Sequence, residues 1–164
     1  MRKLSLATTA ALLLLAALGN SFAQGSQPQL FTDIERALRE REPQWKTERV
    51  YARTETDPLG LDIVLRAGKQ QAAIAVNLWT REKDARDVFT AHATVMSDTR
   101  KGSRRSRLPN LGDENYIWTN PGSAAWPTIH FRQSRVHVTV FAPSITVARR
   151  FARHILEQIN ANQD

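Results

Sequence analysis

Residues 61–78 read LDIVLRAGKQQAAIAVNL, two runs of alternating apolar and polar side chains with a Gly-Lys pair between them. Side chains of a β-strand point to opposite faces in turn, so a period of two predicts strands with one buried face. The connection at residues 67–70 is too short for a crossover, so the two strands must pair antiparallel. The expected buried positions are Leu61, Ile63, Leu65, Ala67, Ala72, Ile74, Val76 and Leu78.

Four more strands are expected on the two sides of this hairpin. One alternating run precedes it, a short run rich in aromatic residues follows later, and a second hairpin lies near the C-terminus. These runs cover residues 50–54, 116–118, 129–131 and 136–140. The sequence therefore predicts an antiparallel sheet of about six strands.

Helices are predicted at three places, where apolar residues recur at spacings of three and four. The first is expected at residues 33–42, because Thr32 and Glu35 form a capping box. The second is expected at residues 81–97, and the third opens at Pro143-Ser144. We predict an α+β fold in which the helices pack on one face of the sheet.

A weak internal repeat fits this layout. Residues 63–66 read IVLR and residues 129–132 read IHFR, and each segment is followed by a predicted amphipathic helix. One interpretation is that the domain consists of two pseudo-repeated strand-strand-helix halves. The other is chance, because apolar alternation before an amphipathic helix looks alike in any α+β protein.

The N-terminal 23 residues have the pattern of a secretory signal peptide. A basic start is followed by a Leu- and Ala-rich run, and small residues stand at positions 21 and 23, which a signal peptidase reads. We expect cleavage before Gln24, which gives a periplasmic or secreted protein with a flexible lead-in at residues 24–29 and one globular domain at residues 30–164. The apolar run is shorter than a bilayer span, so the mature protein is expected to have no transmembrane segment.

Composition excludes several classes of function. The 164 residues contain no cysteine, so disulfide scaffolds, thiol catalysis and cysteine-ligated zinc or iron–sulfur sites are ruled out. The sequence has no Gly-rich phosphate loop and no Gly-x-Ser-x-Gly elbow, and we expect no cofactor.

The full chain has a net charge of +7. Without the signal peptide, 21 Lys and Arg face 16 Asp and Glu, and the resulting net charge of +5 is concentrated in one segment. Its cations are Arg100, Lys101, Arg104, Arg105 and Arg107, with no acidic residue among them. Charges elsewhere balance, which argues against a nucleic-acid partner. Arginine suits the capture of phosphate or carboxylate, so this segment predicts binding to an anionic envelope component or an acidic protein surface. The alternative is a solvated loop that only keeps the protein in solution.

Two histidines mark a candidate metal site on the C-terminal hairpin. A tight turn would place His130 directly opposite His137, with Cβ atoms about 5 Å apart. Two imidazoles at that distance can bind zinc or copper, with Asp113 or Glu114 as a third ligand. Polar sheet faces also accept histidine without a metal. The remaining histidines, His92 and His154, lie on predicted helices and are expected to be packing or surface residues.

Aromatic residues form a second candidate site. Tyr116, Trp118 and Trp126 flank a polar loop at residues 119–123. Aromatic rings beside such a loop can stack on a sugar or line an apolar ligand pocket. The alternative is that they belong to the core or its rim.

The last third of the chain resembles a group of uncharacterised bacterial exported domains. The likeness rests on residues 108–116, which read LPNLGDENY, on the IHFR segment at residues 129–132, and on the strand at residues 136–140. In that group a Leu-Gly-Asp-Glu turn precedes a Phe-Arg hairpin and a C-terminal helix. The resemblance implies an exported domain with no assigned activity, and no catalytic residues carry over.

These observations favour a noncatalytic binding domain for an anionic envelope component or partner protein. A metal-dependent enzyme that uses His130 and His137 is the first alternative, so enzymatic activity stays open. A carrier of a small apolar ligand is the second, and it would require a cavity between sheet and helices. The oligomeric state is not predicted.

Overall fold

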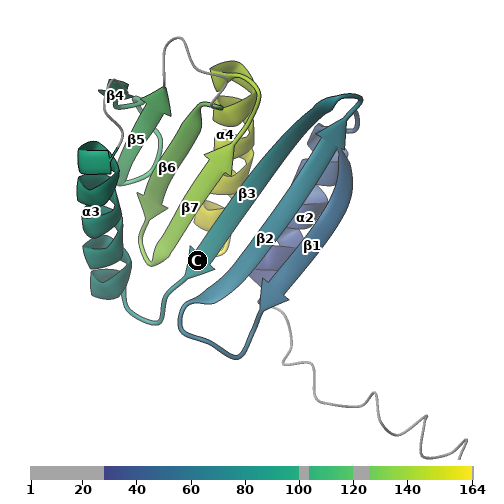
Figure 1. The fold of residues 1–164 in the computed structure, drawn as a ribbon. Helices are drawn as coiled ribbons and strands as arrows, with labels where there is room; N and C mark the ends of the chain where they lie inside the picture. Colours follow the sequence, from purple (N-terminus) through teal and green to yellow (C-terminus); the bar gives the residue numbers. More distant parts are fainter. Residues whose placement is uncertain (1–27, 100–103, 120–125, 164) are drawn as a thin grey trace, which may run out of the picture.

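The computed structural model describes residues 28–99, 104–119 and 126–163 of the chain. Seven antiparallel strands form one sheet in the order β1-β2-β3-β7-β6-β5-β4 (Figure 1). The strands are β1 (Lys46–Arg53), β2 (Leu59–Ala67), β3 (Gln70–Leu78), β4 (Arg104–Ser106), β5 (Glu114–Thr119), β6 (Thr128–Gln133) and β7 (Val136–Phe141). The predicted α+β fold with an antiparallel sheet is confirmed.

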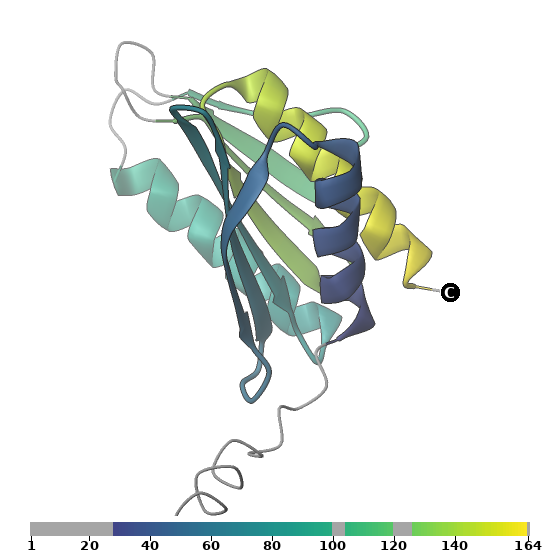
Figure 2. The same ribbon diagram turned by 90° about the vertical axis from the view of Figure 1, so that its right-hand side faces the viewer.

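Three helices of the described residues cover the sheet. α2 (Gln29–Arg41) and α4 (Ile145–Ala161) pack side by side on one face, which we call the back face, and α3 (Glu82–Thr99) lies on the front face (Figure 2). The apolar residues that alternate in β2 and β3 are buried under α2 and α4, as their period of two predicts. None of the helices in the described ranges is long and apolar enough to cross a membrane.

The position of α3 differs from the expected packing of all helices on one face. α3 covers only the half of the front face formed by β5, β6 and β7, where Phe89 and Ala93 pack on Tyr116 and Trp118. Strands β6 and β7 are therefore buried on both faces, whereas most of β1 is exposed. This half of the front face carries large aromatic and imidazole side chains, so a helix on it removes much apolar surface from water.

Two boundaries also differ from the sequence analysis. α2 begins one turn earlier than predicted, after Pro28, because Leu30 and Phe31 are already buried in the core. The capping box at Thr32 was therefore wrong, since Thr32 lies inside the helix. The seventh strand, β4, lies within the predicted basic loop and pairs with β5.

The internal repeat extends to the strands only. β1 to β3 and β5 to β7 are each a three-stranded meander, and the two meanders meet where β3 pairs with β7. The helices that follow them, α3 and α4, lie on opposite faces of the sheet (Figure 2). The two halves are thus alike in strand order and different in how they are covered.

Candidate metal centre

The front face is built from rows of directly paired residues, and the two rows described below take one residue from each strand except β4. Direct partners across antiparallel strands lie on the same face, with Cβ atoms about 5 Å apart. Two neighbouring rows carry the polar residues of interest. The first is Tyr51, Asp62, Ala75, Thr139, His130 and Tyr116, and the second is Arg53, Gly60, Asn77, His137, Arg132 and Glu114.

His130 and His137 are diagonal neighbours in these rows, not direct partners. The expected pairing was wrong because the turn is formed by Ser134 and Arg135, so that His130 pairs with Thr139. The register differs by two residues, and a shift of two leaves every side chain on its own face. Both imidazoles consequently still share the front face, which α3 makes dry: His130 is 1% exposed and His137 is 6% exposed.

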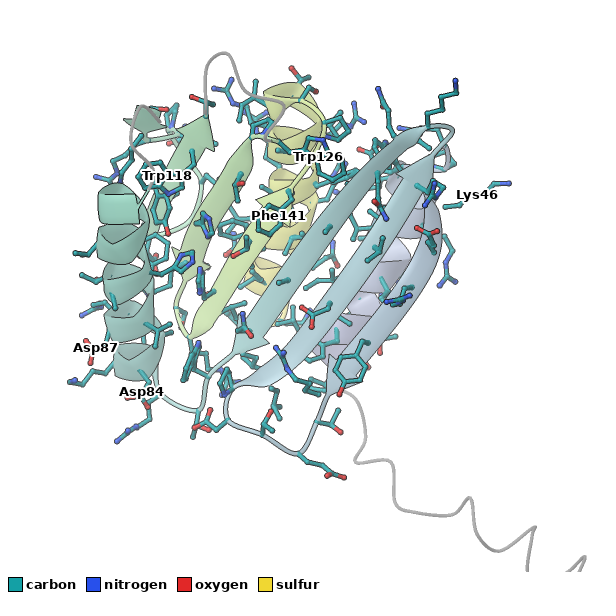
Figure 3. All side chains as sticks on the ribbon, viewed as in Figure 1. Lys46, Asp84, Asp87, Trp118, Trp126 and Phe141 are labelled. Carbon is teal, nitrogen blue, oxygen red and sulfur yellow. The ribbon has the colours of Figure 1, made fainter. Side chains whose placement is uncertain are left out.

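A third histidine completes the cluster from the opposite side. His92 on α3 brings its ring to 4.7 Å from that of His130 and 6.1 Å from that of His137, measured between centroids. One ring nitrogen from each of the three residues lies within 4.8 Å of the others. Three secondary-structure elements thus place imidazole nitrogens around one point, and Figure 3 shows the side chains that fill the space between α3 and β6 and β7.

Two hydroxyl groups fix the orientation of the rings. The Nδ1 atom of His92 lies 2.8 Å from the hydroxyl oxygen of Tyr116, and that of His130 lies 3.0 Å from Oγ1 of Thr139. Hydrogen bonds at Nδ1 leave Nε2 as the coordinating nitrogen, an arrangement typical of metal-bound histidine. Tyr116 also stacks on His130 with ring centroids 4.7 Å apart, which restricts the tilt of that imidazole.

His137 is held in its neutral form. Burial, together with the nearby charge of His92, lowers the pKa of His137 to about 4. Its Nε2 atom is buried and has no hydrogen-bond partner among the described residues. A buried polar atom without a partner costs roughly 1–3 kcal/mol, so native proteins usually provide one. A metal ion would use this nitrogen and requires the neutral ring that burial supplies.

This burial predicts a pH-dependent stability of the metal-free protein. Unfolded His137 takes up a proton near pH 6.5, whereas the folded protein resists it until about pH 4. The unfolded state binds more protons in this window, so the free energy of unfolding should fall by roughly 2–3 kcal/mol between pH 7.5 and 4.5. Urea titrations at both pH values measure this loss. It should shrink in His137→Leu and persist in His154→Gln, and an undiminished loss in His137→Leu would contradict the assignment.

The cluster has the size of a transition-metal site. Zinc binds imidazole nitrogen at about 2.0–2.1 Å, which places nitrogens of a tetrahedral site about 3.3 Å apart. The nitrogens here lie no more than 4.8 Å apart, so small ring rotations would close them onto one ion. The donors are three imidazoles without sulfur, a set that suits zinc, copper(II) and nickel.

Residues of the predicted aromatic site and of the predicted basic segment lie next to each other in the structure. Tyr116 and Trp118 belong to the cluster that packs under α3, and the guanidinium of Arg105 lies over the Tyr116 ring at 4.9 Å from its centroid. Trp126 does not join them and is 41% exposed. Arg100 and Lys101 lie outside the described residues, and Arg104 is described only as part of the β4 backbone, where it pairs with Thr119.

Neither carboxylate proposed as a third ligand reaches the histidines. Asp113 Oδ2 and Glu114 Oε2 bind Arg132 instead, at 3.1 and 2.7 Å. The third member of the cluster is His92, which the sequence analysis placed among packing or surface residues. His92 lies on the side of α3 that faces the sheet, on the same stripe as Phe89, and its ring contacts that of His137. A histidine on the apolar side of a helix was the signal available, but its partners were not, because helix position relative to a sheet is a tertiary property.

A smaller basic site lies on the back face. Arg149 and Arg153 of α4 face the loop that follows the basic segment and line a pocket of about 80 Å³ with Leu108, Pro109 and Leu111. The ion pairs that α4 makes with described residues involve Arg150, His154 and Glu157 instead. These two guanidinium groups therefore remain directed toward the pocket and solvent.

A cavity of about 560 Å³ opens at the end of the sheet where α2 begins and α4 ends. Its walls mix apolar residues such as Leu30 and Ile159 with polar ones such as Gln29, Arg135 and Asn162. The predicted carrier of an apolar ligand requires a predominantly apolar cavity between sheet and helices. This cavity lies between the ends of β3 and β7 and the helices α2 and α4, but its lining is mixed and not predominantly apolar.

Comparisons with known proteins add no relative: no family model, no curated protein and no solved structure matches the chain.

Proposed function

We propose that this protein binds a divalent transition-metal ion, with zinc as the first candidate, through His92, His130 and His137. The observation that carries the proposal is the convergence of three imidazole nitrogens within 4.8 Å, two of them on nearly inaccessible side chains. The buried Nε2 atom of His137 has no hydrogen-bond partner among the described residues, and a metal ion would supply one. The hydroxyl groups of Tyr116 and Thr139 supply the outer hydrogen bonds that such ligands use.

Calorimetric titration of chelator-treated protein with zinc tests this function. Wild-type protein should bind one equivalent, and His92→Ala and His137→Ala should each weaken binding by more than about a hundredfold, since even outer-shell changes cost roughly 10–100-fold. Tyr116→Phe, which removes only the partner of His92 Nδ1, should cost about tenfold. The matched control is His154→Gln, because His154 lies on α4 and binds Glu42 on the other face of the sheet.

Circular dichroism of each variant separates loss of the site from loss of the fold. If the wild-type protein takes up no zinc, copper or nickel, the proposed metal site is wrong and the three histidines serve only in packing. Equal affinity in His92→Ala and wild type would likewise refute the proposed ligand set.

A second candidate function is capture of an anionic envelope component on the back face, favoured by the pocket at Arg149 and Arg153. Arginine forks bind phosphate well, and exposed charges are screened by salt. The wild-type protein should bind vesicles of anionic phospholipid at low salt and release them at about 0.5 M salt. The double variant Arg149→Gln/Arg153→Gln should bind at least about tenfold less tightly, as the loss of two such contacts implies. Binding that resists salt, or equal binding by the double variant, would exclude this surface.

Export is the proposed location. It rests on the sequence of residues 1–23, which lie outside the described ranges. Mass spectrometry of the protein from a periplasmic or culture fraction should find an N-terminus at Gln24. An intact N-terminus on protein confined to the cell interior would refute it.

A further inference from the structure

A metal ion held by the three histidines would keep one coordination position for another ligand. No other His, Asp or Glu among the described residues joins their cluster. Asp84 and Asp87 lie on the side of α3 that points away from the sheet, where they bind Arg81 and Lys83 (Figure 3). Structural zinc sites use four protein ligands, whereas sites with three keep a position for water or a substrate.

On the side toward β3, the front face next to the histidines carries small side chains. Ala75 is the direct partner of Thr139, and Asn77 is the direct partner of His137. α3 lies over β6 and β7 and does not extend across β1, β2 and β3 (Figure 1). A ligand of an ion on the histidines could therefore approach over small, half-buried side chains.

The guanidinium group of Arg53 lies next to these small side chains, on the side away from the histidines. Arg53 stands on β1, two strands away from Asn77, yet its Nη2 atom donates to Oδ1 of Asn77 at 3.0 Å. Its side chain crosses the intervening strand at Gly60, where an added Cβ would lie only 2.2 Å from Nη2. Glycine at this position gives the arginine its path across the sheet. The only ion pair of Arg53 within the described residues is a 3.6 Å contact with Asp62.

From this arrangement we propose that the metal centre binds a small dicarboxylate. One carboxylate takes the open position on the metal, and the other pairs with Arg53. The inference rests on the metal function proposed above. Asn77 is the direct partner of both Gly60 and His137, so the guanidinium over Gly60 lies in the row of His137, about two strand spacings or roughly 10 Å along the sheet. A planar guanidinium and a Lewis-acidic ion are both strong partners for carboxylate.

Visible absorption of the cobalt(II)-loaded protein tests the inference, because the d–d bands of cobalt respond to a change of its ligands. Titration with succinate should shift the bands at a concentration at least about tenfold lower than titration with acetate, which has no second carboxylate. Arg53→Gln should remove this preference. Gly60→Ala should do the same by displacing the guanidinium, while both variants still bind cobalt and respond to acetate.

Arg49→Gln is the matched control, since Arg49 lies on the same strand and face but in another row. It should keep the preference for succinate. Equal responses to succinate and acetate in wild type, or an unchanged preference in Arg53→Gln, would overturn the inference while leaving the metal centre in place. A wild-type protein that binds no cobalt would overturn the metal centre itself, and this inference with it.

Discussion

Saturating zinc is expected to raise the free energy of unfolding by about 3–4 kcal/mol at concentrations of 100 to 1,000 times the dissociation constant. The reason is that the proposed ligands come from α3, β6 and β7, so their cluster exists only in the folded chain. Urea denaturation with and without zinc measures the difference. His92→Ala should lose the increment almost completely, because two histidines on one hairpin bind zinc far less tightly than three. His154→Gln should keep it.

The same ion should change the dynamics of α3 more than those of the rest of the protein. Among the described residues, His92 is the one member of the histidine cluster on α3. The contacts of this helix with the sheet include the 2.8 Å contact of His92 with Tyr116, the packing of Phe89 and Ala93, and a 3.3 Å contact between Glu82 and Arg132. Zinc should therefore slow amide hydrogen exchange in α3 markedly and in α2 little. Equal protection of both helices, or a zinc increment retained by His92→Ala, would contradict a site that bridges helix and sheet.

Local pattern was sufficient to predict the sheet. The alternation in residues 61–78 sets the buried face of β2 and β3, and a short turn forces antiparallel pairing. Neither property depends on distant residues. The face covered by α3 does depend on them, since the connection after β3 allows the helix to turn to either side. Its choice reflects the aromatic surface of Tyr116 and Trp118, which a hydrophobic pattern within α3 does not reveal.

The candidate site was predictable to the extent that it is local. His130 and His137 belong to one hairpin, so sequence spacing alone indicated that they share a face, even though the register was wrong by two residues. His92 joins them through a tertiary contact, because its ring binds the hydroxyl of Tyr116, which lies 24 residues later in the chain. Arg53 reaches its place only because Gly60 lacks a side chain on the strand between, a relation that requires the sheet order.

Removing the side chain of Arg132 should lower the free energy of unfolding more than removing any exposed charge, because this side chain is only 3% exposed and connects three segments. Its Nε atom donates to Glu114 at 2.7 Å, and Nη1 donates to the carbonyl oxygen of Ser134 at 2.6 Å and approaches Asp113 at 3.1 Å. Nη1 also contacts Glu82 at 3.3 Å, at the start of α3. Arg132 thus holds the β6–β7 turn, the start of β5 and α3 together.

Replacing Arg132 by Met should lower the free energy of unfolding by about 3 kcal/mol, near the lower end for a broken buried pair, because the three carboxylates are partly solvated. The free energy of unfolding of Arg132→Lys should lie between those of wild type and Arg132→Met, since lysine keeps the charge but not the planar fork. The control is Arg86→Met, which breaks an exposed pair with the same Glu82 and should cost less than about 0.5 kcal/mol. Urea denaturation at pH 7.5 compares the three variants.

Loss of Arg132 should also weaken zinc binding, although the arginine is not a ligand. Arg132 is the direct partner of His137 across the hairpin, and its contact with Glu82 anchors the helix that carries His92. A less firmly held α3 presents His92 in the coordinating position for a smaller fraction of the time, and apparent affinity falls by that fraction. Calorimetry should therefore find zinc affinity reduced in Arg132→Met and unchanged in Arg86→Met. A destabilised Arg132→Met that binds zinc as tightly as wild type would show that the site needs no anchoring of α3 at its first turn.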